Sequence, residues 1–284
     1  MNEQGGPGAA GAAGGPRAPG GSGGSDSADS ARLPWAGRDL TSSGFEDDDG
    51  SPDDALLAAL AARLAGPSPD TDRALFEAAR SARWIVPVVA APAETETETE
   101  TDTETDVVGR LVEKRTDLAV VTLAAPDGRR ALPVFTSTAA LAAWDPSARP
   151  VPVPAARAAQ AAVAEGCDVL VVDVAGEAPT ELRPSMLWAL AQGATWLPAP
   201  SDPFVERAVA SAVAQEPAVV TTRLEDGTPP GGGVLRVALG LRPGLDQPAV
   251  EALATRVGER LATDGELRAR VDGLAFALEP AATP

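Results

Sequence analysis

From residue 51 onward, apolar residues recur either at helical spacing or in short continuous runs, and this pattern predicts an order of helices and strands. The helices that we expect cover residues 52–65, 70–82, 138–144, 155–165, 185–191, 204–215 and 248–261. The strands that we expect cover residues 84–89, 118–125, 131–135, 151–153, 169–172, a short stretch near 182, 218–224, 234–241 and 274–278.

Capping and turn residues set several of these boundaries. Ser51 is expected to cap the first helix, with Pro52 at its first position and Gly66 at its end. Ser137 is expected to cap the short helix that follows it. Proline cannot donate a ladder hydrogen bond, so Pro87 predicts an edge strand or a bulge in the first strand.

Two segments lack such a pattern. Residues 1–50 are rich in Gly, Ala, Pro and Ser and end in an acidic run, and residues 94–106 form a Glu-Thr repeat with seven carboxylates. Neither segment contains enough apolar surface to offset the entropy lost on ordering. We expect both to be disordered, the first as an N-terminal arm and the second as a loop insertion.

These observations predict an α/β protein of the α+β type, with two small mixed-sheet units behind a disordered N-terminal arm. The first unit covers residues 51–195 and contains the acidic insertion. A proline-rich linker, residues 197–203, follows it. The second unit covers residues 200–284 and has the order α-β-β-α-β.

The composition excludes several kinds of active site. The chain has no histidine, which rules out a Ser-His-Asp triad, a Cys-His dyad and the usual imidazole metal sites. Cys167 is the single cysteine, so it forms no internal disulfide. Its neighbours Glu165 and Asp168 disfavour a thiolate, and we expect a buried small apolar residue. We therefore predict no catalytic residue, no metal site and no cofactor.

The net charge of −18 lies mostly in the segments expected to be disordered. Residues 1–53 carry −6 and residues 94–106 carry −7, which leaves −5 for the rest of the chain. A body of this charge is a poor nucleic-acid binder. The uncharged stretch 184–201 is too polar for a membrane span, and the N-terminus lacks the features of a signal peptide. We expect a soluble cytoplasmic protein that binds neither nucleic acid nor membrane.

Some short motifs match functional patterns without the structural context that gives those patterns meaning. The fingerprint-like Gly6–Gly11 and the elbow-like Gly20–Gly24 lie in the arm with no strand before them. Gly231–Gly233 could hold an anion, but a flexible hairpin loop is the better interpretation. Asp173 and Glu177 follow a strand and could act as acid and base, although turn and solvated roles are commoner.

An ordered set of segments resembles the N-terminal domain of the SseB family. The set comprises Leu132–Ser137, Leu141, Ala143–Trp144, Val151–Ala155, Glu165–Gly166 and Val169–Asp173. The resemblance covers roughly residues 53–192, and residues 195–280 resemble the companion C-terminal domain of actinobacterial members. The biased use of Arg, Ala, Gly and Pro also fits an actinobacterial origin. The resemblance implies a fold and carries over no catalytic residue, and the acidic insertion leaves the local strand order open.

We expect a non-enzymatic protein-binding or adaptor module whose partner is another protein. The candidate interaction surface is Phe135, Thr136, Ser137 and Trp144, where a strand leads into a helix. The same residues could equally be core and a helix cap. Two alternatives stay open: a sulfur-transfer enzyme that uses Cys167 as nucleophile, and a secretion-associated effector or chaperone.

Overall fold

A computed structural model of the chain describes residue 45 and residues 48–91, 117–125 and 128–281. The two predicted disordered segments lie outside this described part, except for Phe45 and residues 48–50. Arg83 Nη2 donates to Asp48 Oδ1 at 2.9 Å, and the N–H of Thr138 donates to the Gly50 carbonyl at 3.0 Å. Residues 48–50 therefore belong to the folded body, and the predicted boundary of the arm after residue 50 is too late.

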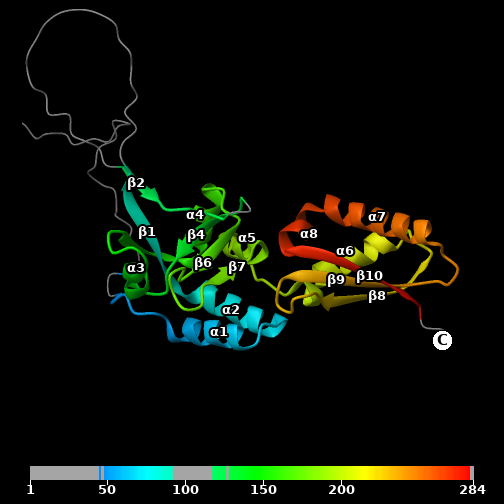
Figure 1. Ribbon diagram of the computed structural model, residues 1–284, viewed down its shortest axis with the longest axis horizontal. Helices are drawn as coiled ribbons and strands as arrows, with labels where there is room; N and C mark the ends of the chain where they lie inside the picture. The colour runs from blue at the N-terminus through cyan, green and yellow to red at the C-terminus, as the bar shows by residue number, and fades with distance from the viewer. Residues whose placement is uncertain (1–44, 46–47, 92–116, 126–127, 282–284) are drawn as a thin grey trace, which may run out of the picture. The chain divides into compact units, whose positions relative to one another are not determined.

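The described residues form eight α-helices, one 3₁₀ helix and ten strands, which confirms the predicted α+β class (Figure 1). In chain order the elements are α1 (Asp54–Ala65), α2 (Pro69–Ser81), β1 (Arg83–Ala91), β2 (Asp117–Val120), β3 (Leu123–Ala124), β4 (Arg130–Val134), α3 (Thr138–Trp144), β5 (Arg149–Pro154), α4 (Ala155–Ala164), β6 (Val169–Val172), β7 (Thr180–Leu182), α5 (Pro184–Gln192), η1 (Ala199–Ser201), α6 (Pro203–Val213), β8 (Val219–Asp226), β9 (Val234–Leu241), α7 (Gln247–Thr263), α8 (Gly265–Arg270) and β10 (Gly273–Pro280).

The part of the chain before the linker contains two sheets. A three-stranded antiparallel sheet has the order β2-β1-β5, and a four-stranded mixed sheet has the order β3-β4-β6-β7. In the mixed sheet, β4 and β6 run parallel, so both strands end at the same edge. An isolated bridge between Ile85 and Phe135 joins the two sheets.

The part of the chain after the linker contains a third sheet with the order β10-β9-β8. β8 and β9 are antiparallel, whereas β10 runs parallel to β9. Alternate residues of β9, Leu235, Val237, Leu239 and Leu241, are buried against α6, α7 and α8. These helices therefore cover one face of the sheet (Figure 1).

The buried apolar side chains fall into three clusters. One joins residues 56–196, a small one contains Ile85, Phe135, Leu141 and Ala148, and one joins residues 199–267. The division between residues 196 and 199 coincides with the predicted linker. That the two parts are separate domains stays a prediction, because charged contacts described below join them. None of the helices in the described ranges is long and apolar enough to cross a membrane.

Pro87 lies in a central strand, so the prediction of an edge strand is wrong. β1 is flanked by β2 and β5, and Pro87 faces Pro150 of β5. Ile85 exchanges both backbone hydrogen bonds with Phe135, so residues 85 and 87 direct their polar groups away from β5. The β1–β2 pairs begin only at Val88. Proline fits here because its position needs no ladder donor on either side.

Other boundaries also differ from the predictions. The expected strand 118–125 is divided into β2 and β3, which belong to different sheets. Asp53 caps α1 by accepting from the Leu56 N–H at 2.8 Å, which Ser51 was expected to do. Helix α8 was not predicted, because its six residues are too short to show a helical period.

Candidate functional site

The four residues of the predicted interaction surface meet at the end of β4, but three of them are buried. Phe135 is 0% exposed, Thr136 4% and Ser137 8%, while Trp144 is partly exposed. The Phe135 and Trp144 rings lie 5.4 Å apart, and Ser137 caps α3 by accepting from the Ala140 N–H at 3.0 Å. Their contacts match the alternative roles of core and cap. That a partner binds there stays a prediction, and only Trp144 offers it a partly exposed side chain.

Asp173 holds the same strand end from the neighbouring strand. Its carboxylate accepts from the Thr136 N–H at 2.9 Å and from the Thr136 hydroxyl at 2.7 Å. Its backbone has a φ of 48°, a left-handed conformation that aspartate tolerates better than most residues. Glu177, its proposed acid–base partner, is exposed and no contact joins the two carboxylates in the described part. Asp173 therefore ties the turn after β6 to the end of β4.

Cys167 is buried, as predicted, with 7% of its surface exposed. Burial raises the pKa of its thiol, Arg130 counteracts this in part, and Glu165 and Asp168 raise it further. A raised pKa leaves little thiolate at neutral pH. The position is therefore a poor one for a nucleophile.

A buried group of charges was not predicted, and it joins the two parts of the chain. We name it the Arg183 cluster: Arg63 of α1, Asp72 of α2, Arg183 before α5, Asp272 before β10 and the carbonyl of Gly231. Arg183 donates to the Asp72 carboxylate, the Asp272 carboxylate and the Gly231 carbonyl, each at 2.9 Å. Arg63 pairs with Asp72 and also donates to Gly231, at 2.9 Å. Two positive and two negative side chains thus satisfy one another.

The carboxylates of the cluster favour the charged form of Arg183. Burial alone would lower the pKa of Arg183, but the carboxylates of Asp72 and Asp272 outweigh it and raise the pKa. Asp72 is 2% exposed and Arg183 is 9% exposed. Buried ion pairs of this kind contribute little net stability, but removing one partner is costly because the other charge stays buried.

The glycine loop before β9 supplies the backbone acceptor of this cluster, the Gly231 carbonyl. Gly231 and Gly233 have φ values of 65° and 79°, which glycine adopts without strain. A Cβ on Gly233 would lie 2.5 Å from the Arg183 side chain, so only glycine lets the guanidinium approach. The flexible hairpin loop expected from the sequence is instead held by two arginines.

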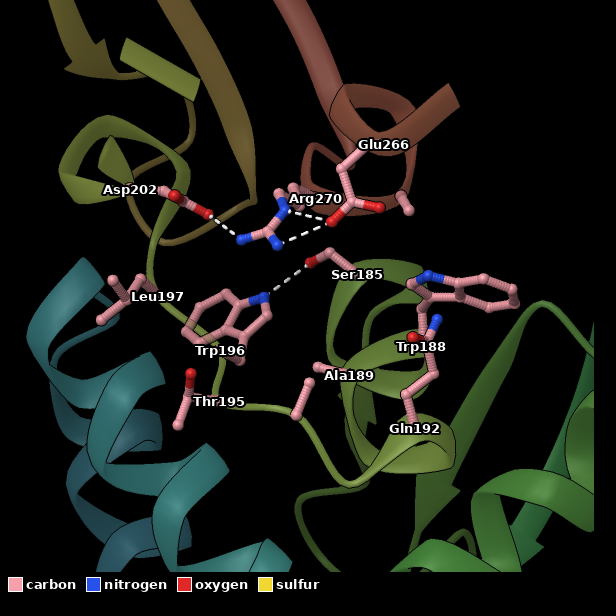
Figure 2. A pocket seen from close by; sticks show the side chains of 12 residues that line it. Ser185, Trp188, Ala189, Gln192, Thr195, Trp196, Leu197, Asp202, Glu266 and Arg270 are labelled. Carbon is pink, nitrogen blue, oxygen red and sulfur yellow. Dashed lines mark hydrogen bonds and ion pairs between the residues drawn. The ribbon is translucent and has the colours of Figure 1, made fainter. Parts of the chain in front are cut away.

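Next to the cluster lies a small pocket between α5 and α8, with a volume of about 60 Å³ (Figure 2). We name it the α5–α8 pocket. Trp196 lies on one side, where its indole N–H donates to the Ser185 hydroxyl at 3.0 Å. Arg270 spans the other side between Asp202, at 2.8 Å, and Glu266, at 2.7 Å. The hydrogen bond to Asp202 raises the pKa of Arg270, and the hydrogen bond to Glu266 raises it further.

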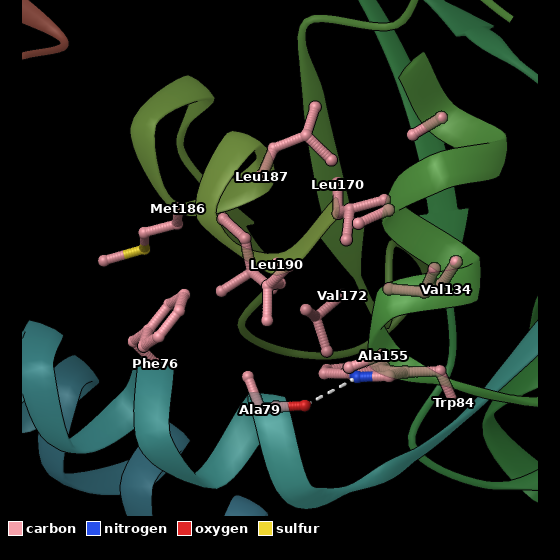
Figure 3. Packing of buried hydrophobic residues seen from close by; sticks show 14 of the residues in the cluster. Phe76, Ala79, Trp84, Val134, Ala155, Leu170, Val172, Met186, Leu187 and Leu190 are labelled. Atoms are coloured by element: carbon pink, nitrogen blue, oxygen red, sulfur yellow. Dashed lines mark hydrogen bonds between the residues drawn. The ribbon is translucent and has the colours of Figure 1, made fainter. Parts of the chain in front are cut away.

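Trp188 stands at the rim of the pocket and is 45% exposed. In Figure 2 its indole points away from Trp196. The opposite face of α5 is fixed, since Met186, Leu187 and Leu190 are buried in the core beneath it (Figure 3). Helical spacing therefore turns Trp188 outward on a rigid support.

The core below α5 also contains a polar anchor. The buried indole of Trp84 donates to the Ala79 carbonyl at 3.0 Å (Figure 3). Phe76 lies 5.7 Å from the Trp196 ring, which connects this core to the wall of the α5–α8 pocket.

Residues 56–189 match the family model of the SseB protein N-terminal domain. Over these residues the chain is similar to an SseB N-terminal domain. The match covers the elements from α1 to most of α5, and it includes Trp188 and Arg183. It does not extend over the part after the linker, so the predicted type of the C-terminal domain stays a prediction. No curated protein and no solved structure matches the chain significantly.

The residues that sequence reasoning missed gave weak signals. Trp188 lies out of step with the apolar positions 186, 187 and 190, which is the signal of an exposed tryptophan. Arg183 and Asp272 are single charges next to a helix start and a strand start. Nothing local distinguishes them from solvated surface residues, because the two residues lie 89 positions apart in the sequence.

Proposed function

We propose that this SseB-domain chain is a non-catalytic protein-binding module, which holds a partner polypeptide at the α5–α8 pocket with Trp188 as its anchor. One observation carries the proposal: a tryptophan that is 45% exposed at the rim of a pocket, on a helix whose other face is buried. Tryptophan is enriched among the residues that dominate binding energy at protein interfaces.

The geometry of the pocket favours a side chain of a polypeptide over a small-molecule ligand. Its volume of about 60 Å³ is far below the several hundred Å³ usual for cofactor sites. It can therefore receive only a small group, while the indole of Trp188 offers a larger flat surface beside it. This combination of a shallow pocket and an aromatic anchor is typical of protein recognition.

The charges near the pocket favour a basic partner segment. Glu266 is exposed, and Arg270, which also lines the pocket, is neutralised by Asp202 and Glu266. A lysine or arginine of the partner could stack on Trp188 and lie near the Glu266 carboxylate, with electrostatic attraction increasing the association rate.

The sulfur-transfer alternative receives no support from the described geometry, and the alternative of a secretion-associated effector or chaperone stays open. A sulfur-transfer role for Cys167 would need an accessible thiolate, whereas the thiol is buried with a raised pKa. That the chain is not an enzyme stays a prediction.

The test compares the proteins that co-purify from the native host with three immobilised chains: wild type, Trp188→Ala and Leu64→Ala. Leu64 is 64% exposed on α1 and serves as the matched control, since it removes a large apolar side chain elsewhere. We expect quantitative mass spectrometry to find at least one protein bound by wild type and Leu64→Ala, and lost at least tenfold with Trp188→Ala. Equal recovery by all three chains would overturn the proposal.

A further inference from the structure

Strand β10 forms an edge of the third sheet, and residues 273–278 of it lack the usual protection of edge strands. Among the described residues, β9 is its hydrogen-bonded neighbour on one side, and no strand lies on the other. Natural edge strands carry charges, prolines or bulges that discourage pairing. Residues 273–278 carry none of these. The charge and the proline of the strand, Glu279 and Pro280, lie at its end, and Glu279 is engaged by Arg223 at 2.9 Å.

The free edge of β10 offers a regular row of backbone donors and acceptors. The Ala281 N–H donates to the Leu241 carbonyl of β9 at 2.8 Å. In a parallel ladder, alternate residues direct their N–H and C=O to the same neighbour. Odd-numbered residues of β10 therefore face β9, and Leu274, Phe276 and Leu278 direct their backbone groups to the open edge.

The side chains of these same three residues lie on the helix-covered face, at the margin of its core. They pair in register with Leu235, Val237 and Leu239, whose side chains are buried there. Nevertheless, Leu274 is 40% exposed and Leu278 is 37% exposed. The helices thus leave apolar surface uncovered along the edge of the strand.

A hollow lies beside each exposed leucine. Leu274 lines one of about 220 Å³ together with Leu261 and Leu267 of α7 and α8. Leu278 lines another of about 340 Å³ together with Leu245 and Val250. Both hollows are mainly apolar, and a strand added to β10 would place side chains next to them.

The sequence of β10 indicates which strand would pair with its open edge. Residues 274–278 read Leu-Ala-Phe-Ala-Leu, which is the same in both directions. An antiparallel copy centred on Phe276 therefore places Leu274 opposite Leu278, Phe276 opposite Phe276 and alanine opposite alanine. Each of the three residues whose backbone groups face the open edge then lies opposite another such residue, which is the condition for hydrogen-bonded pairs. We propose that β10 pairs with β10 of a second copy of this chain, forming a twofold symmetric dimer.

This register pairs the open backbone groups of residues 274–278 and places leucine side chains beside the two hollows. The three outward-facing residues of each copy would exchange about six backbone hydrogen bonds with the other. Leu278 of the second copy would lie beside the hollow next to Leu274, and by symmetry the reverse also holds. A twofold interface requires a surface that complements itself, and a palindromic strand has this property. A partner of unrelated sequence would make no use of the symmetry. The dimer does not rest on the proposed function, since Trp188 lies outside β10.

The test measures the mass of the full chain by sedimentation velocity between about 1 and 100 μM, the range of moderate protein affinities. Leu274→Lys and Leu278→Glu each place a charge opposite a leucine, and we expect each to weaken dimerisation at least tenfold. The double variant Leu274→Lys/Leu278→Glu places lysine opposite glutamate at both positions, and we expect it to dimerise again. Val220→Lys is the control, because Val220 is 54% exposed on β8 at the other edge of the sheet.

Each outcome bears on the proposal. Dimerisation of wild type, the control and the double variant, with loss in both single variants, supports the edge and its register. A wild type that stays monomeric up to about 100 μM would overturn the proposal, as would a Val220→Lys variant that dissociates as well. Failure of a folded double variant to dimerise would overturn the antiparallel register. Circular dichroism of each variant establishes that it is folded.

Discussion

Replacing Arg183 with leucine is expected to destabilise the chain strongly, although leucine fills a similar space. The change removes the donors that reach Asp72, Asp272 and Gly231, all at 2.9 Å. Both carboxylates stay buried, with side-chain exposures of 2% and 9%. The free energy of unfolding therefore falls, because the folded state keeps two buried charges that have fewer partners.

The magnitude follows from the partners that remain. Removing one member of a buried ion pair typically costs about 3–5 kcal/mol. Asp72 keeps its pair with Arg63, and Asp272 keeps the Ser185 N–H at 2.7 Å and hydroxyl at 2.9 Å. We therefore expect the lower end, about 3 kcal/mol. With a urea slope of about 2–3 kcal/mol per molar, the unfolding midpoint should fall by about 1 M.

Urea unfolding followed by tryptophan fluorescence is the assay, because Trp196 lies 5.7 Å from the Arg183 guanidinium and reports on this region. Arg80→Leu is the control, because the Arg80 side chain is 41% exposed and its Nε lies 3.8 Å from Glu77 Oε2. We expect that control to change stability by less than about 0.5 kcal/mol. If Arg183→Leu costs less than about 1 kcal/mol, or no more than Arg80→Leu, the reasoning on buried charges is refuted.

Two further predictions concern single titratable groups. Hydrogen bonds from Arg256, and then from Arg260, lower the pKa of Glu216, so its contribution to stability is present above the unfolded pKa of about 4.3 and is lost as the pH falls through the folded value. Glu216→Gln should therefore cost about 1 kcal/mol at pH 7, since Arg256 is half exposed, and the difference in urea midpoints should vanish at low pH; a difference that persists unchanged at pH 3 would contradict this. Cys167 should react with a thiol reagent at least a hundredfold more slowly in the native chain than in urea, because it is buried with a raised pKa, and comparable rates would show an accessible thiolate.

The sequence was sufficient for elements whose residues carry their own signals. In α2, the apolar residues Leu75, Phe76 and Ala79 recur at helical spacing and are buried, and Ser137 caps α3 as predicted. These features depend on neighbours within one or two turns. The class of fold follows from the order of such elements, and it too was predicted.

Features that depend on distant partners were not predicted. Pro87 indicates an edge only if its backbone position needs a donor, and the bridge between Ile85 and Phe135 removes that need. Arg183 resembles any surface arginine until the fold brings Asp72 and Asp272 to it. Three residues of the predicted interaction surface are buried for a related reason. Phe135, for example, is enclosed by residues from β1 and α3.

The most direct test of the proposed function is site-specific photo-cross-linking in the native host. A benzophenone amino acid replaces Trp188 in one chain and Leu64 in the other, both at exposed helical positions. The account predicts a discrete cross-linked band with one partner polypeptide from position 188 and none of that mass from position 64. Absence of a band at 188, or the same band from both positions, would contradict a binding surface centred on the α5–α8 pocket.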